Sequence, residues 1–369
     1  MYLNNQIRVA TVFSGIGSFE WALKRLDIPY NIIFACDNGD LVLRDIDYKS
    51  EIKNIKKAKT IQDMKSIENN LYSRIKKTNF VERSYLANYE ILDDNFHYDV
   101  RLLDGKKYKG CVDIFVGGSP CQSFSIMGKQ MGLEDTRGTL FYEYARLVKE
   151  IQPKVFIYEN VQGLLKHDKG KTWETIKLVF DSLGYYYSYR VLNSKDYGIP
   201  QNRNRLFVVG FKKKKYKKLF EFPSPVPLKF SLQDFLIESC DKGHFSYKNY
   251  KSCPGKIDEK YFISDKVKFH VLSPGTKSYV SIPKTDLVIA RPLLATMHKM
   301  HRAAVDNYVT VNGKLRRLSP TECSRLMGFG DDFKQVVSDT QMYRQFGNSI
   351  VSDIFVYLFP QIQNTGVFK

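Results

Sequence analysis

The stretch RVATVFSGIGSFEWALKRL, residues 8–26, predicts how the chain folds. It opens with a short apolar run, RVATVF, which is typical of a buried strand. The turn SGIGS follows, and apolar side chains then recur at helical spacing, at Phe19, Ala22, Leu23 and Leu26. Glycines let a backbone approach a ligand closely, and a helix N-terminus favours an anionic group. This unit therefore suits a nucleotide-like ligand, and the alternative is an ordinary tight turn in an α/β protein.

The rest of the first 211 residues repeats this alternation of strands and helices. A second apolar run, residues 31–36, ends in Asp37, about twenty residues past the glycines, where an acid can bind ribose hydroxyls. Further strands are predicted at 112–118, 154–158, 185–192 and 206–211, and helices at 139–150 and 172–183. Strands that alternate with helices form a mostly parallel sheet and bind ligands at the carboxyl ends of the strands. The sequence therefore predicts an α/β fold.

A cysteine follows one of these strands directly. Residues 112–137 read VDIFVGGSPCQSFSIMGKQMGLEDTR, so Cys121 lies where a strand becomes a loop. The loop holds Gly128 and Gly132 among polar residues, as a lid over a substrate would. Glu159 ends a neighbouring strand and is predicted to lie on the same rim. Cys121 is thus a candidate nucleophile, and the alternative is an inert cysteine packed beneath a surface loop.

Composition narrows the class of protein. The chain has 369 residues, enough for two domains, and its hydrophobic content of 43% is too high for disorder. No apolar run reaches the roughly 18 residues of a membrane span, and no signal peptide is recognisable, so we expect a cytoplasmic protein. The six cysteines have no CxxC or zinc spacing, so we expect no metal and no disulfide framework. The net charge of +18 favours a polyanionic partner, although a generally basic protein would also carry it.

Two segments interrupt the alternation. Residues 50–77 carry isoleucines, leucine and methionine at helical spacing with lysines between them, and Thr60 and Asp63 form a cap that splits this stretch into two helices. We interpret about 50–90 as a helical insertion that covers the sheet, its lysines facing solvent. KKKKYKK at 212–218 and the proline-rich 222–230 mark a domain boundary. The lysine run is either a solvated loop or a phosphate contact.

A cytosine is the substrate that unites these features. Carbon 5 of cytosine is a poor nucleophile until a thiolate adds at carbon 6, and a carboxyl group that holds a proton at N3 assists this step. Cys121 and Glu159 offer these two groups, and Arg203 and Arg205 add positive charge. A base inside a duplex cannot be reached, so the nucleotide must be flipped out.

The chain also resembles a known family, the DNA cytosine-5 methyltransferases, and most closely bacterial restriction-modification methylases of the HhaI type. Six motifs carry the resemblance in order along the chain. They are FSGIG at 13–17, PCQ at 120–122, ENV at 159–161, QNRNR at 201–205, RRLSPTECSRLMGF at 316–329 and QFGNSIV at 345–351. The resemblance implies a class I S-adenosylmethionine-dependent methyltransferase fold, Rossmann-like, with a smaller target-recognition domain. We expect a catalytic domain at 1–211, target recognition at 212–336, and a segment at 337–369 that returns to the catalytic domain.

The resemblance assigns roles to individual residues. Cys121 is the implied nucleophile, while Glu159, Arg203 and Arg205 hold and polarise the flipped cytosine. An S-adenosylmethionine pocket, instead of a dinucleotide site, is implied at Phe13, Gly15, Gly17, Asp37, Pro120, Asn348 and Ser349, with Asp99 and Val100 contacting adenine. Asn38 stands where some relatives have a tryptophan beside the adenine, which softens the expected stacking.

The partner implied by the resemblance is double-stranded DNA. Its predicted contacts are Gln122, Ser125, Met127, Lys129, Gln130 and Arg137 in the loop after Cys121, and His298 and Arg302 in the segment 291–308. Met127 lies where HhaI-type loops carry a serine that enters the duplex. In 291–308 the alternative is that Leu293, Leu294, Met297 and Met300 pack a small core while the polar side chains face water.

The expected protein is a monomer that transfers a methyl group to carbon 5 of cytosine within a specific DNA sequence. Its expected partner, if one exists, is a restriction endonuclease that acts separately. Two alternatives stay open. One is a methyltransferase that acts on cytosine in transfer RNA, and the other is a DNA-binding regulator without catalytic activity. Cys121, Glu159 and Arg205 together argue against the regulator, because binding alone has no chemical need for them.

Overall fold

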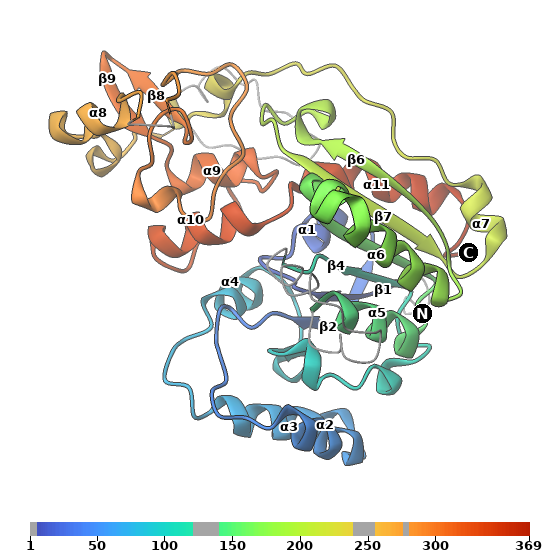
Figure 1. Ribbon diagram of the computed structural model, residues 1–369. Helices are drawn as coiled ribbons and strands as arrows, with labels where there is room; N and C mark the ends of the chain where they lie inside the picture. Colours follow the sequence, from blue (N-terminus) through green and yellow to red (C-terminus); the bar gives the residue numbers. More distant parts are fainter. Residues whose placement is uncertain (1–5, 121–139, 239–254, 276–279) are drawn as a thin grey trace.

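A seven-stranded sheet forms the centre of the protein in a computed structural model that describes residues 6–120, 140–238, 255–275 and 280–369 (Figure 1). The strand order is β3-β2-β1-β4-β5-β7-β6. The parallel strands are β1 (Ile7–Val12), β2 (Tyr30–Cys36), β3 (Phe96–His97), β4 (Ile114–Gly117) and β5 (Val155–Val161). Strand β7 (Asn204–Phe211) runs antiparallel between β5 and β6 (Tyr186–Asn193). The predicted α/β fold with a mostly parallel sheet is confirmed.

Helices cover both faces of this sheet. On one face, α1 (Ser18–Arg25) and α11 (Ser352–Asn364) pack against each other and against side chains such as Val9. On the other face, α5 (Leu140–Ile151) and α6 (Lys171–Ser182) pack over Ala10 and Val12. Because β1 is covered on both sides, its apolar residues Val9, Ala10 and Val12 do not alternate strictly with polar ones.

The insertion is helical, as predicted, but α2 and α3 lie beside the sheet and do not cover it, and one lysine is buried. It forms α2 (Tyr48–Lys57), α3 (Ile61–Tyr72) and α4 (Phe80–Asn88), and Figure 1 shows α2 and α3 projecting beside the sheet. Thr60 Oγ1 accepts the Asp63 N–H at 3.0 Å, and Asp63 accepts the Thr60 N–H at 2.9 Å, so the predicted cap begins α3. The lysines of α2 are exposed, as expected. Lys65 of α3 is buried instead, because Glu68 provides a partner for its charge.

The remaining elements lie beyond β7. They are α7 (Lys214–Leu219), α8 (Asp265–Val271), the antiparallel hairpin β8 (Tyr308–Val311) and β9 (Lys314–Arg317), α9 (Pro320–Leu326) and α10 (Asp339–Asn348). Figure 1 shows α8, β8, β9, α9 and α10 grouped to one side of the sheet. Short 3₁₀ helices are η1 (Asp93–Asn95), η2 (Val100–Leu102), η3 (Gly105–Tyr108), η5 (Gln162–Gly170), η6 (Ser194–Tyr197), η7 (Leu232–Phe235), η9 (Glu259–Tyr261) and η10 (Met297–Lys299). Among the described residues, none of the helices has the length and hydropathy needed to span a bilayer.

The end of the chain packs on its beginning. The rings of Phe19 and Phe355 meet edge to face with centroids 5.3 Å apart. Arg25 of α1 forms a buried ion pair with Asp353 of α11, at 2.8 Å between NH1 and Oδ2. These contacts agree with a C-terminal segment that returns to the sheet, while the exact domain limits stay a prediction.

Candidate active site

The carboxyl ends of the parallel strands bring most of the predicted site residues to one edge of the sheet. Strand β1 leads into the turn that begins at Phe13, β2 ends just before Asp37, and β3 ends two residues before Asp99. Glu159 lies near the end of β5. Asp37 N donates to His97 O at 3.0 Å, so the ends of β2 and β3 are joined at this edge. Parallel sheets bind ligands in this position.

A hydrogen bond joins the glycine turn to Asp37. The Asp37 carboxylate accepts the Gly15 N–H and the Gly39 N–H, each at 2.9 Å. Burial raises the pKa of Asp37, and these two N–H groups oppose the shift. Gly15 has φ +53°, and a Cβ built there would meet no atom within 4 Å, so space is open above the turn. Each Asp37 oxygen keeps one lone pair for a further donor, which fits a pair of ribose hydroxyls.

Gly17 allows a close approach that another residue would prevent. It has φ +76°, and a Cβ added there would lie 2.3 Å from the Tyr89 ring. The Tyr89 hydroxyl donates to Ile16 O at 2.9 Å and to Gly17 O at 2.6 Å. Phe13 also has a positive φ, +53°. The turn is therefore fixed from below by Tyr89, a residue of the segment after α4 that the motif does not include.

The predicted adenine pair is more enclosed than expected. Asp99 is 3% exposed, and its carboxylate accepts from the Arg101 side chain and backbone and from the Tyr48 hydroxyl at 3.0 Å. Val100 is buried, and Arg146 donates to its carbonyl at 2.8 Å. A direct contact between the Asp99 carboxylate and adenine would require exchange of one of these partners. The role of this pair stays a prediction.

The C-terminal candidates lie beside the start of α1. Ser349 Oγ is 3.4 Å from Ser18 Oγ, and Ser18 also donates to Ile350 O. Ser352 Oγ donates back to Ser18 O at 3.0 Å. Asn348 is exposed at the end of α10. The motif at 345–351 is thus brought next to the glycine turn, although more than 300 residues separate the two in the sequence.

A carboxyl and a guanidinium group face each other at the ends of β5 and β7. Arg205 Nε lies 3.0 Å from Glu159 Oε1, with side chains 18% and 12% exposed. Burial raises the pKa of Glu159, and the positive charges of Arg205 and Arg203 oppose this shift. Gly118 lies so close that a Cβ there would be 2.7 Å from Glu159 Oε2. Glu159 therefore reaches the strand end that leads to Cys121, and its burial favours the protonated form of the carboxyl group.

Arg203 differs from Arg205 in its surroundings. Its guanidinium is buried and donates to three backbone carbonyls, those of Leu293 at 2.9 Å, Gly347 at 2.9 Å and Ser349 at 2.8 Å. Burial lowers the pKa of Arg203 to about 9, which leaves it charged at neutral pH. These contacts favour a positioning role for Arg203 over direct contact with a base.

Two residues that the sequence reasoning did not single out support the site. Gln201 is fully buried, donates to Leu326 O at 2.8 Å and accepts the Leu293 N–H at 3.0 Å. Asn160 donates to Ser119 O at 3.0 Å, next to the exposed Pro120. Gln201 belongs to the motif QNRNR and Asn160 to the motif ENV, so the motifs include both residues. Their backbone partners lie far away in the sequence and could not be predicted from the motifs.

Most of the predicted DNA contacts cannot be placed. Cys121, Gln122, Ser125, Met127, Lys129, Gln130 and Arg137 lie outside the described residues. His298 and Arg302 are half-buried, and His298 Nδ1 is 3.2 Å from Ala295 O. Leu293 and Met297 are buried in the main core, so the segment 291–308 does pack through its apolar side chains. The contact of His298 and Arg302 with DNA stays a prediction.

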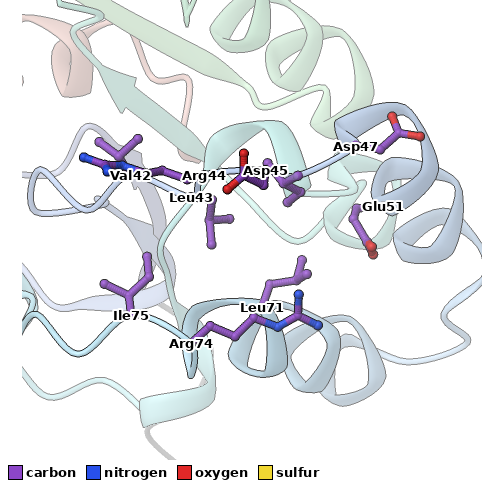
Figure 2. A pocket seen from close by; sticks show the side chains of 10 residues that line it. Val42, Leu43, Arg44, Asp45, Asp47, Glu51, Leu71, Arg74 and Ile75 are labelled. Atoms are coloured by element: carbon purple, nitrogen blue, oxygen red, sulfur yellow. The ribbon is translucent and has the colours of Figure 1, made fainter.

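A separate hollow of about 360 Å³ lies between residues 42–47 and helix α3 (Figure 2). Figure 2 shows Leu43 and Leu71 across from each other, with Arg74 and Glu51 at the sides. None of the predicted site residues lines it. Within the described ranges, no three His, Cys, Asp or Glu side chains come together as a metal site would require.

Comparison with known proteins identifies the family. The model of the C-5 cytosine-specific DNA methylases matches residues 64–364. The chain belongs to this family. Type II methyltransferase M.HhaI of Haemophilus parahaemolyticus is 36% identical over 264 residues, which cover 70% of this chain and 77% of that protein. The orphan methyltransferase M.SPRI of Bacillus phage SPR is 36% identical over an alignment that covers 99% of both chains.

Solved structures agree on the fold of this C-5 cytosine methylase. The Dnmt2 methyltransferase of S. pombe superposes with a TM-score of 0.64 at 16% identity, covering 97% of this chain and 98% of that one. A putative DNA modification methyltransferase from an E. coli prophage gives 0.56 at 19% identity, covering 97% and 99%. The family and the fold together make the protein a DNA cytosine-5 methyltransferase with double-stranded DNA as its substrate, and they imply the use of S-adenosylmethionine.

Proposed function

We propose that this enzyme methylates a cytosine flipped out of a specific double-stranded sequence, through a covalent bond between Cys121 and carbon 6. The observation that carries the proposal is the Glu159 carboxyl group, buried, paired with Arg205 at 3.0 Å, and next to Gly118 on the strand end that leads to Cys121. A carboxyl group with a raised pKa is suited to hold a proton at a ring nitrogen.

The residues divide the chemistry between them. The Cys121 thiolate forms a bond to carbon 6, and the displaced electron pair makes carbon 5 nucleophilic while Glu159 holds the proton at N3. Arg205 fixes the Glu159 carboxyl and keeps it facing the ring. After the transfer, solvent takes the proton from carbon 5, the electron pair of that bond forms the double bond between carbons 5 and 6, the bond between sulfur and carbon 6 breaks, and the N3 proton returns to Glu159. Methylated cytosine and free thiolate result.

The cofactor site proposed for S-adenosylmethionine is the turn after β1 together with the adjacent strand ends. S-adenosylmethionine, when bound, supplies an electrophilic methyl group. Asp37 binds the ribose hydroxyls through its remaining lone pairs, and the open space at Gly15 admits the ligand. Phe13, Gly17, Asp99, Val100, Pro120, Asn348 and Ser349 complete the proposed pocket. Arg203 holds residues 347 and 349 against it through their carbonyls.

DNA is bound, in this proposal, by the loop after Cys121 and by the segment 291–308. Arg302 is half-buried beside the folded hairpin, and arginine is the commonest reader of guanine in the major groove. Gln122, Ser125, Met127, Lys129, Gln130 and Arg137 contact the duplex around the vacated position, and His298 lies near Arg302. The enzyme acts as a monomer, and a cognate restriction endonuclease, where present, acts separately on the same sequence.

The decisive experiment uses Cys121→Ser. The variant should bind DNA and S-adenosylmethionine as the wild type does but should lose turnover and the covalent adduct with DNA that contains 5-fluorocytosine. An adduct of undiminished yield would place the nucleophile elsewhere. The wild-type enzyme is assayed with duplex DNA and with transfer RNA in parallel. Methylation of RNA alone would contradict the assignment of double-stranded DNA as the substrate.

A further inference from the structure

A buried carboxylate in the insertion contacts the edge of the proposed cofactor pocket. Glu68 lies on α3 and is 2% exposed. Its Oε1 accepts the Tyr98 N–H at 2.7 Å and the Asp99 N–H at 3.0 Å. Both donors belong to the segment that follows β3. One side chain of the insertion therefore fixes the backbone at the predicted adenine-contacting residues.

The second oxygen of Glu68 is also fully engaged. Glu68 Oε2 lies 3.2 Å from Lys65 Nζ and 3.0 Å from His97 Nδ1. A carboxylate only accepts, so His97 Nδ1 is the donor, and His97 Nε2 lies 2.9 Å from the Tyr108 hydroxyl oxygen. Burial raises the pKa of Glu68, but His97 and Lys65 outweigh it and lower the pKa to about 2. The group thus stays ionised at neutral pH and accepts four hydrogen bonds.

The insertion touches the same segment at a second point. The Tyr48 hydroxyl, at the start of α2, donates to Asp99 Oδ2 at 3.0 Å. The Arg101 guanidinium stacks over the Tyr48 ring at 3.9 Å and also pairs with Asp99. His97 O in turn accepts the Asp37 N–H at 3.0 Å. The backbone position of residues 97–99 therefore also determines the position of Asp37, the proposed ribose-binding acid.

We propose that Glu68 is a positioning residue for the adenine end of the cofactor pocket, which makes the insertion a structural part of cofactor binding. Glu68 acts through the backbone of residues 98 and 99 and does not touch the cofactor. The proposal rests on the proposed function, because that function assigns the cofactor to this edge of the sheet. It also explains why a lysine is buried on α3, where the spacing of apolar residues predicts a solvated one.

The test is Glu68→Gln, which keeps the size of the side chain but replaces one acceptor oxygen with a donor amide. The amide must face either two backbone N–H groups or Lys65 and His97, so residues 97–99 have to shift. The dissociation constant for S-adenosylmethionine, measured by calorimetry, should rise about tenfold. The rate constant at saturating cofactor and the affinity for DNA should stay within about twofold of wild type, because neither depends on adenine binding.

Two further variants make the result interpretable. Glu51→Gln makes the same chemical change on α2, where Glu51 accepts only from Asn54 at 3.2 Å, and should leave cofactor affinity unchanged. Tyr48→Phe removes one hydroxyl from Asp99 without adding a donor and should weaken cofactor binding by a few fold. If Glu68→Gln does not fold, Tyr48→Phe decides the proposal.

Two outcomes would overturn the proposal. The first is a folded Glu68→Gln variant, or in its place Tyr48→Phe, that binds the cofactor as tightly as wild type. The second is an equal loss of DNA affinity, rate constant and cofactor affinity, which would mean a general structural role. A wild-type protein that binds no S-adenosylmethionine would instead contradict the proposed function, so the two failures are distinguishable.

Discussion

Adding one methyl group at Gly118 should displace the Glu159 carboxyl group. A Cβ at this position would lie 2.7 Å from Glu159 Oε2 and 3.0 Å from the Glu159 carbonyl oxygen, whereas ordinary contacts begin at 3.4 Å. The carboxyl oxygen must therefore move by 3.4 minus 2.7, or about 0.7 Å. Misplacing a reacting group by about 1 Å can cost on the order of a hundredfold in rate. We expect Gly118→Ala to lower the rate constant for methyl transfer by about 10- to 100-fold.

The assay measures a single turnover with labelled S-adenosylmethionine and saturating duplex, so that binding does not limit the rate. Gly163→Ala is the matched control, because a Cβ there would meet only Val161 Cγ2, at 3.9 Å. Thermal unfolding of Gly118→Ala is measured alongside, because the added Cβ also lies 3.0 Å from the Glu159 carbonyl oxygen and a loss of stability must be told apart from a loss of rate. If Gly118→Ala and Gly163→Ala both react at the wild-type rate, the position of the Glu159 carboxyl does not limit the chemistry and its assigned role is wrong.

The same site supports three further predictions. Burial raises the pKa of Glu159, and the protonated carboxyl group is the active form, so the single-turnover rate should fall as pH rises through that raised pKa. Glu159→Gln should react about 10²- to 10⁴-fold more slowly and should lose this pH dependence. A variant with the wild-type pH profile would contradict the proton-holding role. Arg203→Ala removes three buried hydrogen bonds and should lower the free energy of unfolding in urea by at least about 3 kcal/mol, whereas a loss below about 1 kcal/mol would exclude a positioning role. Lys214→Ala with Lys215→Ala should methylate a short duplex within about twofold of wild type, because α7 follows the end of β7 opposite Arg205; a large loss would mean that these lysines contact phosphate.

The sequence predicted the central fold because its signals are local. The strands β1 and β5 are mostly apolar and do not alternate strictly, which is typical of strands buried on both faces. The Thr60 and Asp63 cap depends on residues three positions apart, so it was readable directly. The position of Asp37 beside the glycine turn also follows from strand and turn alone.

Contacts between distant side chains and backbone were not predictable in this way. The Arg203 guanidinium binds carbonyls 90 to 146 residues away, and any residue type can provide a carbonyl. The burial of Lys65 depends on the partner charge of Glu68, which periodicity does not report. Helix α10 was not predicted, because the motif at 345–351 was read only as a cofactor block, although Met342 and Phe346 have helical spacing. The hairpin β8–β9 was also missed, since its strands are short and carry charged residues.

The packing of α11 on α1 has a consequence for the time at which the enzyme becomes active during its synthesis. Ser18 and Arg25 lie in α1, directly after the glycine turn, but they bond to Gly328 and to residues 349–353, more than 300 residues later in the chain. A nascent chain folds from its N-terminus as it leaves the ribosome. Until α11 has emerged, the cover of this face of the sheet is incomplete, and Ser18 lacks its bonds with Ile350 and Ser352. We therefore expect methylation of DNA to begin only after α11 has been made and has packed on α1.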